Sequence, residues 1–166
     1  MTRRLCKIAL LASYALLLAL IASGNITDPG SNRPFVQHVL AMDTTFRSPG
    51  VMWRAVDRPA LQKLAYLAII ATETAAAALL SWGVVRLSRC VREPAAVFEK
   101  AKDVAVVGLT LSLVLWVGGF LAVGGEWFAM WQSQTWNGVA SAGRFLLAGG
   151  IVLLVLLQRE RADADP

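Results

Sequence analysis

Four long runs of apolar residues, separated by shorter polar segments, set the pattern of this chain. The runs extend over Ile8 to Thr27, Leu64 to Val85, Val104 to Gly125 and Gly138 to Gln158. A helix needs roughly 20 residues to cross a hydrocarbon core of about 30 Å, so each run is long enough to span a membrane. Residues 28–63 carry eight charged side chains and are excluded as a further span. The pattern predicts a single all-α membrane domain over residues 1–166, a bundle of four transmembrane helices.

The segment between the first two runs, residues 28–63, has a pattern of its own. Pro34 suits a first helical turn, and four apolar residues that follow it share one helical face. These residues are Phe35, Val36, Val39 and Leu40. We therefore expect a short amphipathic helix that lies on the membrane surface. Further along the segment, Trp53 is expected to act as an interfacial anchor.

The segment between the last two runs, residues 126–137, is rich in tryptophan. Three of the six tryptophans, Trp127, Trp131 and Trp136, lie here with one carboxylate and no basic residue. Tryptophan prefers the membrane–water boundary, where its ring lies among the headgroups and its N–H stays hydrated. We expect this loop to lie along the bilayer and to form one cluster with the short helix of the 28–63 segment, which brings His38 near Gln132.

Composition agrees with a membrane protein and predicts its orientation. Hydrophobic residues make up 57% of the chain and charged residues 16%, whereas ordinary soluble domains have roughly 45–50% and about 25%. If the N-terminus lies inside, ten Lys and Arg residues fall on the inner side, which includes the 86–103 loop, and five fall outside. This excess predicts that both termini lie in the cytoplasm. The net charge of +5 does not indicate nucleic-acid binding, because the basic residues flank the spans.

The first run leaves one alternative open. Residues 1–24 end on small residues that loosely resemble a cleavage site, so a cleaved signal peptide is the competing interpretation. The run from Ile8 to Thr27 is long for the apolar part of a signal peptide, and we therefore favour a transmembrane helix. Cys6 and Cys90 both fall at inner helix ends, where they should stay reduced, and this placement excludes a disulfide in the outer loops.

Only two charged side chains, Glu73 and Arg144, interrupt the apolar runs. At 1.5 Å per residue they lie roughly 14 Å and 9 Å from the outer face, at depths where an unpaired charge is costly. Glu73 either forms a site for a proton, an ion or a ligand, or holds the bundle together as a protonated or paired side chain. Arg144 either extends to the headgroups or pairs with Glu73. We expect the two to share one buried polar network. The nearest polar groups in sequence are Thr72, Thr74, Asn137 and Ser141.

The sequence contains no pattern typical of catalysis. It has no glycine-rich phosphate loop, nucleophile elbow, zinc motif or dinucleotide fingerprint. His38 is the only histidine, and because no Cys or second His lies nearby we expect it to form hydrogen bonds and to bind neither a metal nor haem. We therefore predict a non-enzymatic protein without metal or cofactor. The candidates for a ligand site or polar network are Glu73, Arg144, Glu126, His38, Asp43, Trp127, Trp131, Gln132, Trp136 and Asn137.

Several of these motifs resemble one known family. They are Asn25 to Asp28, Asn32, Pro34 to Leu40, Met42 to Thr45, the span with Glu73, Gly125 to Ser133, and Trp136 to Gly138. Together they are similar to the bacterial family of predicted small integral membrane proteins, catalogued as domain of unknown function 2165. The resemblance implies a four-span protein of the bacterial inner membrane and brings no established activity with it.

Two functions of different kinds follow as hypotheses. In the first, the protein is an accessory or interaction protein whose tryptophan-rich loop docks another membrane protein or a second copy of the chain. In the second, it binds or carries a small lipophilic or anionic molecule, such as a quinone or a lipid, between the outer loops and the charges at positions 73 and 144. An independent transporter is less favoured, because four helices leave little room for a pathway without oligomerisation. Membrane lipids are expected to surround the protein in each case.

Overall fold

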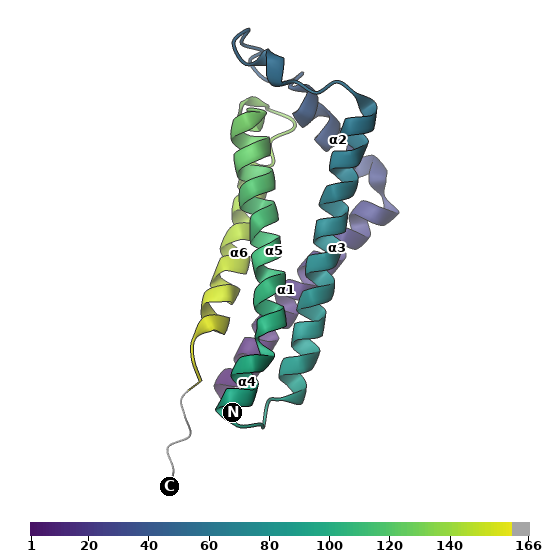
Figure 1. Cartoon of the computed structure of the whole chain (residues 1–166). Helices are drawn as coiled ribbons and strands as arrows, with labels where there is room; N and C mark the ends of the chain where they lie inside the picture. Colours follow the sequence, from purple (N-terminus) through teal and green to yellow (C-terminus); the bar gives the residue numbers. More distant parts are fainter. Residues whose placement is uncertain (161–166) are drawn as a thin grey trace.

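The computed structural model describes residues 1–160, and this part of the chain is helical without strands (Figure 1). Its elements are α1 (Thr2–Thr27), α2 (Pro29–Ala41), η1 (Met52–Arg54), α3 (Pro59–Arg89), α4 (Ala95–Ala101), α5 (Asp103–Val114), η2 (Leu115–Trp127), η3 (Met130–Gln132) and α6 (Val139–Leu157). α4, α5 and η2 form one continuous helix, Ala95–Trp127. With this helix counted once, four helices within the described residues are long and apolar enough to cross a membrane. The predicted all-α, four-span architecture is confirmed.

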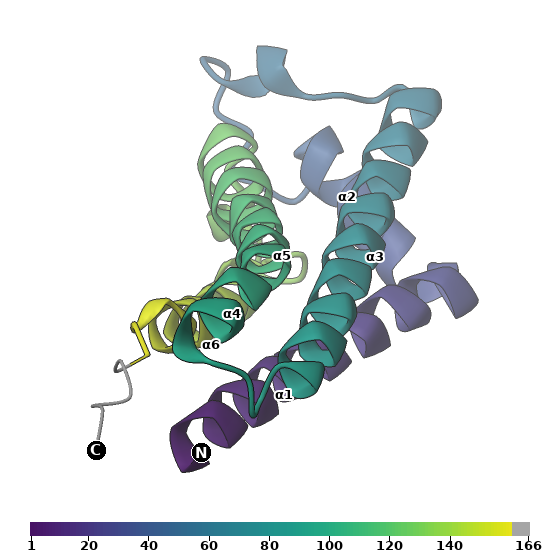
Figure 2. The ribbon, with the colours of Figure 1, turned by 60° about the horizontal axis from the view of Figure 1, so that its bottom comes forward.

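The four rods form a ring in which each helix touches two others. Helix α3 packs against α1 and α5, and α6 packs against α5, η2 and α1. Figure 2 shows α3 and α5 side by side, with α1 crossing beside them. The start of α1 and the end of α6 lie at one end of the bundle, hereafter the terminal end, and α2, η1 and η3 lie at the other, the loop end (Figure 1).

Small residues allow α3 and α5 to approach closely where Gly83, near the end of α3, meets Ala105, near the start of α5. A Cβ added to Gly83 would lie 2.7 Å from the Cβ of Ala105 and 3.0 Å from its Cα. Around this contact the core is filled by large side chains, among them Leu11, Leu80 and Leu109, each of which is fully buried. Close approach at small residues is how helices gain packing energy in a membrane, where lipid competes with any apolar side chain.

We expect Gly83→Ala to destabilise the protein by about 1–3 kcal/mol, because the added methyl group meets the α5 backbone and cannot be relieved by a rotamer change. Gly150→Ala on α6 is the matched control, since nothing lies within 4 Å of its added Cβ. Thermal unfolding of both variants in the same mild detergent measures the difference. Equal midpoints for the two variants would contradict the close α3–α5 packing.

The third span departs from the α-helix that its apolar run predicts. The continuous helix that contains it begins with α4, whose N-cap is Pro94, but from Leu115 to Trp127 it is a π-helix. The Phe128 amide donates to the carbonyl oxygen of Val123, five residues earlier, at 3.0 Å. Such helices are rare, usually last one turn, and are frequent at functional sites. Trp116 and Phe120 lie on this segment.

At the loop end, α2 and the tryptophan-rich loop form the cluster that the sequence predicts. Val39 and Met42 are buried together with Phe128, Ala129 and Met130. Two further contacts join the segments: Thr44 and Ser133 share a hydroxyl hydrogen bond of 2.8 Å, and the Phe46 amide donates to Oε1 of Gln132 at 2.9 Å. The loop end is therefore one packed unit that covers the bundle.

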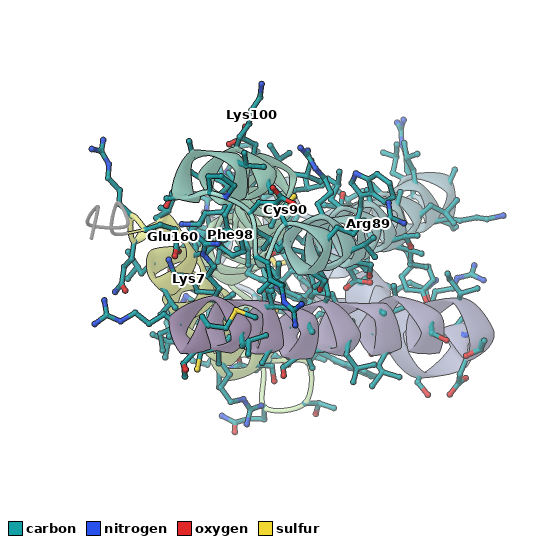
Figure 3. All side chains as sticks on the ribbon, turned by 90° about the horizontal axis from the view of Figure 1, so that it is seen from below. Lys7, Arg89, Cys90, Phe98, Lys100 and Glu160 are labelled. Atoms are coloured by element: carbon teal, nitrogen blue, oxygen red, sulfur yellow. The ribbon has the colours of Figure 1, made fainter. Side chains whose placement is uncertain are left out.

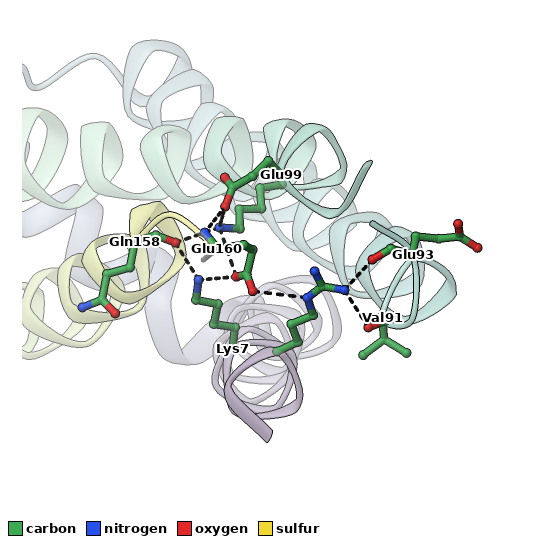
Figure 4. Close-up of polar contacts among 8 residues, drawn as sticks. Lys7, Val91, Glu93, Glu99, Gln158 and Glu160 are labelled. Atoms are coloured by element: carbon green, nitrogen blue, oxygen red, sulfur yellow. Dashed lines mark hydrogen bonds and ion pairs between the residues drawn. The ribbon is translucent and has the colours of Figure 1, made fainter. Parts of the chain in front are cut away.

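At the terminal end, an ion-pair cluster ties the end of α6 to α1 and α4. Glu160 accepts from Nε of Arg4 at 3.2 Å and from Nζ of Lys7 at 2.6 Å, and Nζ of Lys102 lies 3.6 Å from it (Figure 4). Lys7 and Lys102 also donate to the carbonyl oxygen of Gln158, which satisfies an end carbonyl of α6. Figure 3 shows Lys7 and Glu160 together beside Phe98, whereas Lys100 points away.

Candidate functional site

A short chain of polar side chains lies inside the bundle near the loop end. Glu73 on α3 is only 2% exposed, and its Oε2 accepts a 2.7 Å hydrogen bond from Nδ2 of Asn25 in the last turn of α1. The carbonyl oxygen of Asn25, an end carbonyl of α1, in turn accepts from the hydroxyl of Tyr66 at 2.7 Å. Tyr66 and Asn25 are also buried. The three residues fix α1 to α3 and present a carboxyl group toward the interior.

Glu73, Asn25 and Tyr66 line one side of a cavity of about 560 Å³, a size within the roughly 300–1,000 Å³ of small-molecule sites. The other polar side chains at its wall are Ser31, Asn32, Thr135, Asn137 and Ser141. Of all the described side chains that line the cavity, only Glu73 has a carboxyl group, and none is basic. We call this space the Glu73 cavity.

Aromatic rings form the rest of the wall in a continuous series. Their centroids follow one another at 6.4 Å from Trp136 to Phe35, 6.4 Å from Phe35 to Phe120, 4.9 Å from Phe120 to Trp116, and 4.6 Å from Trp116 to Phe145. The rings come from α2, η2, α6 and the tryptophan-rich loop, whereas the polar chain comes from α1 and α3. The cavity wall therefore combines a buried polar chain from α1 and α3 with aromatic rings from the other elements.

A second, apolar cavity of about 250 Å³ adjoins the first. It lies between α2, α3 and η2 and shares Phe35, Val36, Ile69 and Phe120 with the wall of the Glu73 cavity. Its other lining side chains are hydrophobic, and Gly119 and Gly124 complete its wall. The two spaces together offer a polar compartment next to an apolar one.

The loop end closes the Glu73 cavity on one side, and three of the predicted residues lie there. Trp136 stacks on the ring of His38 at 4.7 Å, and Nδ1 of His38 shares a 2.7 Å hydrogen bond with Oδ2 of Asp43. Gly138 makes room for Phe35, because a Cβ at Gly138 would come within 2.8 Å of the Phe35 ring. His38 and Asp43 therefore act on the cavity through Trp136 and do not line it.

The remaining predicted residues near the tryptophan-rich loop are exposed or form hydrogen bonds within the loop. Trp127 stands edge-on to Trp53 at 5.6 Å, and Trp131 is edge-on to Phe46 at 5.9 Å. Both tryptophans are about half exposed, as interfacial anchors are expected to be. Asn137 donates to the carbonyl oxygen of Trp131 at 3.2 Å. Glu126 is exposed at the end of η2.

The expected network of Glu73 with Arg144 is wrong. Arg144 is exposed and donates to Oγ of Ser141 at 2.9 Å, and within residues 1–160 it forms no ion pair with Glu73. The physical reason is that Arg144 lies only six positions into α6, so its long side chain reaches the boundary while the α6 positions that line the cavity are Ser141, Ala142 and Phe145. Thr72 is also outside the network, because its hydroxyl donates to its own helix.

Sequence reasoning missed the partners of Glu73. Asn25 reads as part of a turn cluster, yet it ends α1 with a buried side chain. Trp116 lies within the third apolar run, where the sequence does not distinguish it from Trp82 in the second; Trp116 is 2% exposed and lines the cavity, whereas Trp82 is 52% exposed. The available signal was that Asn25 and Tyr66 are rare polar groups near the ends of long apolar runs. Among residues 1–160, no three His, Cys, Asp or Glu side chains gather in a way that could hold a metal.

Comparison with protein families finds one match. Residues 3–159 match the model of the family described as predicted small integral membrane protein, domain of unknown function 2165. Neither the curated proteins nor the solved structures yield a match. The match covers α1 to α6 and therefore includes both sides of the Glu73 cavity.

Proposed function

Because the chain belongs to the family of predicted small integral membrane proteins, domain of unknown function 2165, we propose that it acts within the membrane as a binding protein for a small amphiphilic molecule. The observation that carries this proposal is the Glu73 cavity, which is lined by the polar chain of Glu73, Asn25 and Tyr66 and by a series of aromatic rings in an apolar bundle. Ligand sites are typically apolar cavities with a few converging polar groups, and this cavity has both features.

The shape of the site supports a ligand with a polar head and an apolar tail. The head would lie against Glu73, Asn25 and Tyr66, where hydrogen-bonding groups are concentrated. The tail would occupy the adjoining apolar cavity between α2, α3 and η2. The proposal contains no chemical step, and the protein is proposed to bind or carry the molecule without changing it.

Docking of a protein partner through the tryptophan-rich loop is supported less well. The loop already packs on α2 and on residues 44–54 through Met130, Trp136 and Gln132. Its exposed rings, together with Trp53 and Phe46, have the pattern of membrane anchors. An anionic ligand is disfavoured too, because no basic side chain of residues 1–160 lines the Glu73 cavity.

The excess of basic residues on one side supports an orientation with the termini in the cytoplasm of a bacterial cell and the Glu73 cavity near the outer leaflet. A molecule dissolved in that leaflet would reach the site from the bilayer. This placement forms part of the proposal.

We expect Gly24→Phe to abolish binding, because Gly24 lines the Glu73 cavity and has open space where its side chain would grow. Gly143→Phe is the matched control: Gly143 also has open space but is absent from the cavity wall. Each protein is purified in mild detergent, and native mass spectrometry with lipid extraction quantifies what co-purifies. Wild type and Gly143→Phe should carry a small molecule that Gly24→Phe lacks.

Equal amounts of the molecule in all three proteins would refute a site in this cavity. A stoichiometric protein partner, with no small molecule enriched, would favour the docking function in its place.

A further inference from the structure

We propose that the polar head of the ligand is an organic cation, an ammonium group held between the carboxylate of Glu73 and the aromatic side of the cavity. This inference rests on the proposed function and specifies the chemical class of its ligand. It draws on three observations: the charge of the wall, the free oxygen of Glu73 and the series of rings.

The charge of the wall is one-sided. Glu73 is the one acidic residue that lines the cavity among the described residues, none of the lining residues is basic, and Glu73 is buried without a basic partner. A buried carboxylate without a partner is costly, and a bound cation would supply the missing opposite charge. A ligand that carries a negative head would instead meet a like charge.

The hydrogen bonding of Glu73 leaves one oxygen available. Nδ2 of Asn25 donates to Oε2, and no described residue donates to Oε1. An ionised carboxylate interacts through both oxygens, so the ammonium group of a ligand can lie against Oε1. The amide of Asn25 orients the carboxyl group for this contact.

The aromatic side is suited to a cation as well. The faces of Trp and Phe rings carry negative potential and attract ammonium groups within about 6 Å of the ring centroid. The cation–π contacts of the described residues involve Phe98, Trp53 and Trp127. The rings of Trp116, Phe120 and Phe145 therefore have no cation from the chain and are available to a ligand.

The size of the Glu73 cavity and the apolar cavity beside it further define the chemical class of the ligand. A cavity of about 560 Å³ holds an ammonium group with several carbon substituents, and the apolar cavity beside it accepts a short hydrocarbon portion. Two sources supply such a group in a membrane: the head of an amine-bearing lipid, or a free amphiphilic amine. Both present the same chemistry to Glu73.

The test compares two probes that differ only in charge: a phenylalkyl trimethylammonium ion and its uncharged tert-butyl isostere. Binding to the wild-type protein in nanodiscs of phosphatidylglycerol is measured by calorimetry. We expect the cation to bind at least roughly ten-fold more tightly than the isostere. Glu73→Gln should remove this preference, whereas Glu126→Gln, which changes an exposed carboxylate outside the cavity, should keep it.

Each outcome has a definite meaning. If the isostere binds as tightly as the cation, the head is neutral and the cation inference is wrong while the proposed function stands. If neither probe binds and no small molecule co-purifies with wild type, the proposed function fails as well. If Glu73→Gln does not fold, the comparison of the two probes on the wild-type protein still shows whether the site prefers a cation. Repeating it in nanodiscs with phosphatidylethanolamine separates the sources, because a lipid ligand would compete with the probe and a free amine would not.

Discussion

Glu160→Gln is expected to lower the free energy of unfolding by about 2–3 kcal/mol, at or below the lower limit of the roughly 3–5 kcal/mol for breaking a fully buried ion pair, because water reaches this end of the bundle. The side chains of Glu160, Lys7 and Lys102 are 10%, 7% and 4% exposed. Removing the carboxylate charge leaves two nearly buried ammonium groups side by side. It also weakens the connection from α6 to α1 and α4.

Thermal unfolding in detergent measures this effect, and Arg159→Gln is the control because Arg159 is the exposed neighbour of Glu160 in sequence. We expect the control to unfold within a few degrees of wild type. If Glu160→Gln unfolded at the same temperature as Arg159→Gln, the cluster would contribute no stability.

The same ion pairs make stability depend on pH. Burial alone would raise the pKa of Glu160, but the hydrogen bonds from Lys7 and Arg4 and the charges of Lys7 and Lys102 outweigh it and hold the pKa below its usual range. The stabilisation is therefore complete above the unfolded-state pKa of a glutamate, about 4.3. It is lost as the pH falls further, through the pKa of the folded state. The unfolding temperature of wild type should fall over this range by more than that of Glu160→Gln.

The spans and the loop-end cluster could be predicted because each rests on a strong local signal. A run of about 20 uncharged apolar residues has few alternatives to a membrane helix. The apolar face of α2 and the tryptophans of the loop must both avoid water at the same end of the bundle, so their meeting follows from the order of the spans.

The partner of Glu73 could not be predicted, because depth along a helix does not fix the direction that a side chain faces. Alanines surround Glu73 at positions 71 and 75–78, so α3 has no distinct apolar face from which to derive its rotation. Glu73 and Arg144 have similar expected depths in the membrane, which suggested that they pair. The rotation of α3 about its axis instead directs Glu73 toward Asn25. The π-helix was equally hidden, since its glycines also fit tight α-helical packing.

Asn25→Leu and Glu73→Met should each destabilise the protein by about 1–3 kcal/mol, while the double variant should lose clearly less than the sum. Asn25→Leu leaves Oε2 of Glu73 buried without its donor, and Glu73→Met leaves the Asn25 amide buried without its acceptor. Replacing both partners removes both unsatisfied groups and leaves apolar side chains of similar size, which can be nearly neutral. The hydrogen bond from Tyr66 goes to the backbone of residue 25, so it survives in all three variants.

The double-mutant cycle, measured by thermal unfolding in detergent, should give a coupling energy of about 1–3 kcal/mol between positions 25 and 73. A second cycle with Glu73→Met and Arg144→Met is the control. It should give a coupling near zero, because the Arg144 guanidinium is exposed and bonded to Ser141. Coupling in the second cycle and none in the first would restore the Glu73–Arg144 network and remove Asn25 from the site. The coupling of Glu73 with Asn25 should exceed that with Arg144 because the rotation of α3 directs the Glu73 carboxyl group toward α1. Oε2 then bonds to Asn25, and Oε1 is left for the cavity.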